Sequence, residues 1–220
     1  MTTAKPFALE EDEPKRVAEA VQRMKLKHVV ITAVARDDLK DGGAVHFART
    51  ISAIREMDPS IVIEVLVPDF HAQVWCIQIV LDARPDIFNH NMETIERLTP
   101  VVRSRAKYRT SLEALRWAKE LSAGVVTKSG VMLGLGEKET ELFQTMDDLR
   151  EAGCEVLTMG QYLRPTPKHL PVVEYIAPEQ FTYYGDIARR KGFLYVASGP
   201  LVRSSYHAAD FHPVVRVQVG

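Results

Sequence analysis

The chain has 220 residues, of which 46% are hydrophobic and 26% are charged, the balance of an ordinary globular domain rather than of a disordered or fibrous chain. The formal net charge is -1, so no basic field indicates nucleic acid as a partner. No apolar run approaches the roughly 20 residues that span a bilayer, so we expect no membrane partner and a cytoplasmic location. Cys76 and Cys154 lie outside any CxxC or CxxxC spacing, which predicts neither a disulfide framework nor a cysteine-based metal site.

Helical and strand-like segments alternate along the chain. The first helix is predicted at 14–24, where apolar residues recur at helical spacing, and the first strand at 28–34, a nearly continuous β-branched run. Further helices are expected at 44–57, 72–83, 92–98, 111–121, 139–152 and 178–191. Further strands are expected at 61–67, 87–89, 125–132, 156–161 and 193–197. This alternation predicts a single α/β domain over residues 1–220 with a parallel sheet.

Two closures of such a sheet compete, an open doubly wound sheet and a full or partial (β/α) barrel. Polar residues follow nearly every predicted strand, as expected if the carboxyl ends of all strands surround one site. We therefore favour the barrel-type arrangement.

The first two polar segments have both a structural and a functional interpretation. Arg36, Asp37 and Asp38 precede two glycines and form either a charged turn or a loop whose backbone N–H groups hold a carboxylate or phosphate. Glu64 stands inside an apolar strand, where an unpaired carboxylate would cost several kcal/mol. Glu64 therefore has either a buried partner in the protein or a ligand.

Three later segments, residues 89–93, 127–137 and 158–165, are also rich in polar groups. Residues 89–93 bring together Asn89, His90, Asn91 and Glu93, although a lone histidine such as His90 is more typical of a structural role. Residues 127–137 lack the order GxxxxGKS/T, which excludes a Walker-type phosphate loop.

Four residues of these segments keep two interpretations. Lys128 and Glu137 either neutralise each other or meet a ligand. Gln161 and Tyr162 end a predicted strand and suit either a purine cradle or a wall of the core.

Taken together, these segments resemble the lipoyl synthase family over nearly the whole chain, from about Lys25 to His207. The matching blocks are 30–44, 63–70, 88–94, 127–137, 157–163, 169–172 and 198–208. The resemblance implies a partial TIM-like barrel of the radical S-adenosylmethionine type with two 4Fe-4S clusters. One cluster, held by CxxxCxxC, cleaves S-adenosylmethionine to a 5′-deoxyadenosyl radical, which abstracts hydrogen from C6 and C8 of a carrier-bound octanoyl chain; the second cluster donates sulfur.

The resemblance also implies site residues and partners. Either Ser204 or Ser205 is similar to the serine ligand of the second, auxiliary cluster. The implied partners are an octanoylated lipoyl carrier protein, either a glycine cleavage H protein or a lipoyl domain of 2-oxoacid dehydrogenases, and an electron donor such as ferredoxin or flavodoxin. The implied positions for S-adenosylmethionine or substrate are Thr32, Arg36, Asp37, Asp38, Glu64, Asn89, Asn91, Glu93, Lys128, Glu137, Gln161 and Tyr162.

The sequence departs from the family pattern in its cysteines. Neither family cysteine motif occurs in these residues, so we expect an N-terminally truncated, inactive chain that lacks the first barrel strand, holds neither cluster and exposes a sheet edge. Ala33 and Ala35 stand where the family usually carries Ser and Asp. Two other hypotheses stay open: a non-catalytic module that binds S-adenosylmethionine or the carrier, and an unrelated aldolase-like enzyme with a Schiff base on Lys128.

Overall fold

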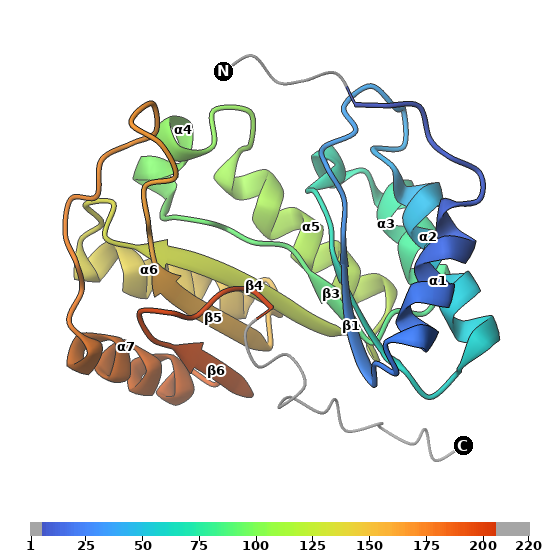
Figure 1. Ribbon diagram of the computed structural model, residues 1–220. Helices are drawn as coiled ribbons and strands as arrows, with labels where there is room; N and C mark the ends of the chain where they lie inside the picture. The colour runs from blue at the N-terminus through green and yellow to red at the C-terminus, as the bar shows by residue number, and fades with distance from the viewer. Residues whose placement is uncertain (1–5, 206–220) are drawn as a thin grey trace.

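The computed structural model of the protein describes residues 6–205. Its strands form one six-stranded sheet in which every pairing is parallel and the strand order follows the chain (Figure 1). A doubly wound sheet requires a reversal of strand order, so the sequential order confirms the partial barrel. The strands are β1 (His28–Thr32), β2 (Val62–Leu66), β3 (Ile87–Asn89), β4 (Val126–Leu133), β5 (Val156–Gln161) and β6 (Tyr195–Ser198).

The longer helices lie along the outside of this curved sheet (Figure 1). Outward-facing strand residues such as Ile63 and Phe88 join helix residues such as Ile51 and Leu115 in one buried core. No helix within residues 6–205 is both long and apolar enough to cross a membrane. The helices are α1 (Glu13–Arg23), α2 (Ala44–Met57), α3 (Val74–Asp82), α4 (Thr99–Val102), α5 (Tyr108–Leu121), α6 (Glu139–Glu151) and α7 (Pro178–Arg190), with short 3-10 turns η1 (Phe70–Ala72) and η2 (Glu96–Leu98).

The predicted helix at 92–98 is wrong. The chain after β3 instead stays alongside β4, because His90 N donates to Lys128 O and Glu93 N donates to Gly130 O, at 3.0 and 2.9 Å. Glu93 takes a left-handed φ of 65° and forms an isolated bridge with Val131, so helix begins only at η2 and α4. Pairing with a neighbouring strand thus overrides the local helical pattern.

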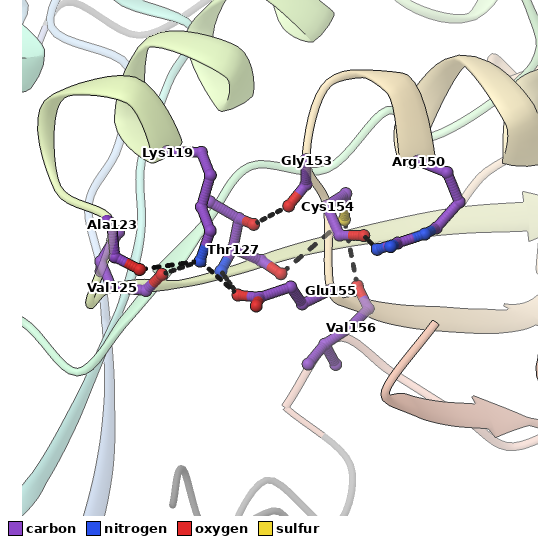
Figure 2. A network of polar contacts seen from close by, with 9 residues as sticks. All are labelled: Lys119, Ala123, Val125, Thr127, Arg150, Gly153, Cys154, Glu155 and Val156. Carbon is purple, nitrogen blue, oxygen red and sulfur yellow. Dashed lines mark hydrogen bonds and ion pairs between the residues drawn. The ribbon is translucent and has the colours of Figure 1, made fainter. Parts of the chain in front are cut away.

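The amino-terminal ends of β4 and β5 are tied to the end of α5 by Lys119 (Figure 2). Its Nζ donates to Glu155 Oε2 at 2.8 Å and to the carbonyl oxygens of Ala123 and Val125 at 3.2 and 2.9 Å. Thr127 strengthens the same corner, since its Oγ1 donates to Gly153 O at 2.7 Å. These bonds hold the starts of two neighbouring strands at the end of the sheet opposite their carboxyl ends.

Replacing Lys119 by Met is expected to lower the free energy of unfolding by about 1–3 kcal/mol, because three acceptors lose one charged donor. Urea denaturation followed by circular dichroism measures the change. The exposed Lys168→Met is the matched control and should lie within about 0.5 kcal/mol of the wild type. Equal stability of the two variants would contradict the role assigned to Lys119.

Candidate functional site

A buried ion pair lies on the inner face of the sheet. Glu64 on β2 is 0% exposed, and its neighbours Ile63 and Val65 face the helical layer. The Nζ atom of Lys128 on β4 lies 2.9 Å from the Glu64 carboxylate, and Asn89 Nδ2 on β3 donates to Glu64 Oε1 at 2.6 Å. Of the two interpretations open for Glu64, the structure therefore shows partners within the protein.

The surroundings of Glu64 favour its charged form. Burial raises the pKa of this carboxyl group, but the neighbouring His28 and the ammonium of Lys128 outweigh it, and the net pKa lies below the usual range. His28 Nε2 lies 3.7 Å from the Glu64 carboxylate, beyond ordinary hydrogen-bond distance. Lys128 is 3% exposed and paired, which leaves the aldolase hypothesis without an accessible amine nucleophile.

A cavity of about 280 Å³ lies at the carboxyl ends of β4 and β5. Besides Thr158 and Gln161 on β5, its polar lining comes from two segments that are distant in sequence. Asn91 and Glu93 follow β3, and Arg203 and Ser204 follow β6. The apolar lining includes Leu66, Met132 and Val202.

The wall formed by Asn91 and Glu93 carries an unsatisfied acceptor. Asn91 Nδ2 donates to Glu93 Oε1 at 3.2 Å, whereas Asn91 Oδ1 is buried without a hydrogen-bond partner in the described part of the chain. Burial raises the pKa of the Glu93 carboxyl group. A buried acceptor that lacks a donor is costly, and non-glycine residues with a left-handed φ such as Glu93 cluster at functional sites. This wall is therefore suited to a ligand that presents hydroxyl or amino donors.

The predicted residues at the ends of β4 and β5 hold loops. The Glu137 carboxylate accepts from Gly134 N and Leu135 N at 2.5 and 2.9 Å, which closes the turn after β4. The Gln161 side chain bonds to the backbone of residues 174 and 176, although Gln161 also lines the cavity. Tyr162 Oη donates to Leu170 O at 2.9 Å.

The predicted residues after β1 lie apart from this cavity. Arg36 is buried and forms two hydrogen bonds with Asp38, at 2.8 and 2.7 Å, so the segment is a structured charged turn. Asp37 pairs at the surface with Arg105 at 3.3 Å. Thr32 and Arg36 line a separate cavity of about 270 Å³ between β1, α1 and α2.

His90 is part of the fold rather than of the cavity. It is fully buried, with Nδ1 2.8 Å from Val67 O and Nε2 2.9 Å from Ser111 Oγ. A carbonyl can only accept, so Nδ1 carries the proton and Nε2 accepts from the hydroxyl. Burial, followed by the nearby positive charge of Arg103, lowers the pKa of His90 to about 4.

Sequence reasoning missed the cavity residues on β4 and β5 themselves, among them Gly130, Thr158 and Gly160. A signal for them was present. Side chains alternate between the two faces of a strand, so Gly130 and Met132 share the face of Lys128. The parallel register then places Thr158 opposite Gly130 and Gly160 opposite Met132.

Comparison with known proteins places the chain in a family. The model of the Radical SAM superfamily matches residues 2–149. The chain is 57% identical over 208 residues to the lipoyl synthase of Rubrobacter xylanophilus, covering 94% of this chain and 65% of that protein. It is 53% identical over 206 residues to the lipoyl synthase of Phocaeicola vulgatus, covering 94% of this chain and 72% of that protein.

The chain belongs to the lipoyl synthase family. Solved structures of more distant proteins share its fold. A methylornithine synthase superposes with a TM-score of 0.60 at 10% identity, covering 89% of this chain and 64% of its own. HydG, a maturase of the [FeFe]-hydrogenase, superposes with a TM-score of 0.65 at 16% identity, covering 88% of this chain and 50% of its own. Both superpositions support the fold of this chain, a partial barrel built on a parallel sheet.

The two cysteines do not fit the iron–sulfur clusters that the family implies. Both are buried, and burial raises the pKa of Cys76 to about 11 and that of Cys154 to about 12, which disfavours the thiolates that ligate iron. Cys154 belongs to the structural network of Figure 2. Within residues 6–205, no three His, Cys, Asp or Glu side chains are grouped so that they could hold a metal ion.

The two candidate serines differ in position. Ser204 is half-buried and lines the cavity at β4 and β5, whereas Ser205 is exposed and does not line it. Tyr206, His207 and Ala208, which complete the last matching block, lie outside the described residues. Of the two serines, Ser204 alone is therefore placed to meet a group bound in the cavity.

Glu64→Gln is expected to destabilise the fold by about 3–5 kcal/mol, because it leaves the Lys128 ammonium buried without its counter-charge. Lys128→Met should cost a similar amount. The double variant Glu64→Gln/Lys128→Met removes both charges and should recover a large part of this loss. Urea denaturation of the single and double variants measures the coupling, and additive losses would refute a direct ion pair.

Stability is expected to fall as the pH is lowered from about 6.5 to about 4, in part through His90. The unfolded state gains a proton on this histidine near its ordinary pKa, whereas the folded state resists protonation until about 4. His90→Gln should flatten this part of the profile of unfolding free energy against pH. The exposed His71→Gln serves as the control, and an unchanged slope in His90→Gln would contradict the assignment.

Proposed function

We propose that this chain carries the S-adenosylmethionine and substrate site of a lipoyl synthase, which inserts sulfur at C6 and C8 of a protein-bound octanoyl-lysine to make lipoyl-lysine. The observation that carries the proposal is the cavity wall of Asn91 and Glu93, with its unsatisfied acceptor, in a chain of this family. S-adenosylmethionine supplies a 5′-deoxyadenosyl radical in such enzymes.

The residues at the cavity suit the chemical groups of S-adenosylmethionine. This ligand carries ribose hydroxyls and two amino groups, which can donate to the free Oδ1 of Asn91 and to the Glu93 carboxylate. The exposed Arg203 on the other wall is a donor for the ligand carboxylate. Met132 offers an apolar surface for an alkyl chain. In this proposal the chain binds and orients both reactants.

In this proposal the ion pair of Glu64 and Lys128 holds the cavity wall in place and does not bind the ligand. Asn89 is held by Glu64, and Asn91 follows two residues later, so the position of the Asn91 wall depends on the pair. Of the remaining candidates, Glu137 and Tyr162 act by holding the loops around the cavity. Ser204, on the cavity lining, is the serine we propose for contact with the auxiliary cluster.

The proposed partners follow from the reaction. The octanoyl chain is delivered on a lysine of a lipoyl carrier, either a glycine cleavage H protein or a lipoyl domain of a 2-oxoacid dehydrogenase. A ferredoxin or flavodoxin is the proposed electron donor. The cavity opens at the carboxyl ends of the strands, where an acyl-lysine arm can enter without displacing the helical layer.

A second candidate function is a non-catalytic module that binds S-adenosylmethionine or the lipoyl carrier. The buried cysteines with raised pKa values favour it, because these 220 residues offer no thiolate set for a reducing cluster. The two functions share the cavity. They differ in whether the chain forms lipoyl product when S-adenosylmethionine, a reductant and an octanoylated carrier are supplied.

Isothermal titration of the 220-residue chain with S-adenosylmethionine should show binding to one site. Glu93→Gln is expected to weaken this binding at least about tenfold, because a charge-assisted hydrogen bond is worth about 1.5–3 kcal/mol. Glu113→Gln, an exposed substitution on α5, is the matched control. No heat with the wild-type chain would refute the proposal. Equal affinities of Glu93→Gln and Glu113→Gln would show that Glu93 does not contact the ligand.

A further inference from the structure

Gly160 lies where another part of the backbone touches the sheet. A Cβ atom at this position would stand 2.1 Å from the carbonyl oxygen of Val202 and 3.1 Å from its carbonyl carbon. Such a distance is far inside van der Waals contact. The obstructing atoms belong to the backbone, so no change of rotamer relieves the clash, and the segment around Val202 would have to move.

The requirement at residue 160 is for space and not for an unusual backbone conformation. The glycines with positive φ in the described chain are Gly42, Gly43, Gly134, Gly136, Gly153 and Gly192, and Gly160 is not among them. Any residue could adopt its φ inside β5. Only the approach of Val202 therefore demands that position 160 have no side chain.

Short backbone bonds hold the approaching segment on the end of β5. Gly199 N donates to Met159 O at 3.1 Å, and Gln161 N donates to Pro200 O at 3.4 Å. Val202 N then donates to Gly199 O at 3.1 Å and turns the chain back over the sheet. This turn delivers Arg203 and Ser204 to the cavity.

The cavity wall of Asn91 and Glu93 also packs against a glycine, on the neighbouring strand β4. A Cβ atom at Gly130 would stand 2.8 Å from Thr158 Oγ1 and 2.9 Å from Asn91 Oδ1. Gly130 thus admits the Asn91 wall, as Gly160 admits the Val202 segment. Both glycines line the cavity on the inner face of the sheet. Because neither has a side chain, the segment of Asn91 and the segment of Val202 can both lie close against β4 and β5.

We propose that Gly160 is a positioning residue of the ligand site: the empty space at residue 160 lets the segment 200–204 lie against β5 and brings Arg203 to the ligand held by Asn91 and Glu93, with Ser204 beside it on the same wall. This inference rests on the proposed function for the identity of that ligand. Its structural part, the placement of residues 200–204 by Gly160, is testable without any ligand.

The experiment uses Gly160→Ala in the 220-residue chain. Hydrogen exchange read by mass spectrometry should show lost protection at the amides of Gly199 and Val202 in the segment 199–202, while the central amides of β5 keep theirs. Titration with S-adenosylmethionine should show an affinity at least about tenfold lower than that of the wild type. Gly124→Ala is the matched control, because a Cβ atom there meets nothing within 4 Å, and it should change neither measurement.

A second variant covers the case in which Gly160→Ala fails to fold. The double substitution Arg203→Gln/Ser204→Ala leaves the glycine in place and removes only the side chains that the segment delivers. It should keep wild-type exchange at residues 199–202 and lose S-adenosylmethionine affinity by at least about tenfold. Wild-type affinity in this variant would overturn the proposal.

The remaining outcomes separate the inference from the proposed function. If the wild-type chain binds S-adenosylmethionine and Gly160→Ala binds it equally well with unchanged exchange at 199–202, the positioning role is refuted. If the wild-type chain does not bind S-adenosylmethionine, the proposed function fails. The exchange comparison of Gly160→Ala with Gly124→Ala then still decides whether residue 160 holds the segment.

Discussion

The ion pair between Glu64 and Lys128 decides which face of the sheet is the inside of the barrel. It spans β3, because Glu64 lies on β2 and Lys128 on β4, with Asn89 hydrogen-bonded to the pair from the strand between them. A slip of one residue in either strand would turn a charge into the apolar layer that packs against the helices. Two buried charges are tolerated only when they face each other, so the pair selects one register for three strands.

The site is arranged around this register. Residues after β3 continue along β4, and residues after β6 fold back onto β5, so the cavity walls come from chain segments more than a hundred residues apart. Each wall reaches the sheet at a glycine, Gly130 or Gly160, where a side chain would occupy the same space. The polar groups of the cavity are thus placed by backbone approach, a precise means because backbone hydrogen bonds leave little freedom.

The two cysteines differ in their chemistry from what membership of the family implies. The relatives named lipoyl synthase support S-adenosylmethionine as the ligand, and the Asn91 wall has the acceptors for it. The two thiols, however, sit in the outer core with raised pKa values and serve packing. The proposed binding of the organic reactants is therefore separate from the binding of clusters, and the lining of the cavity suits only the first.

The sequence by itself determined the element types, the parallel α/β class and the family, because strand periodicity, helical periodicity and ordered motif blocks are local properties. It also marked Glu64 as a residue that needs a partner. It misplaced the helix at 92–98 and grouped twelve residues as one site, although Arg36, Asp38, Glu137 and Tyr162 bond to the protein around them. Only the tertiary structure decided that Lys128 forms the ion pair with Glu64. It also decided that Ser204, and not Ser205, lines the cavity. Finally, it showed that the backbone of Val202 packs against Gly160. The reason is that each depends on which segments share one face of the sheet, and neither spacing nor composition records that proximity.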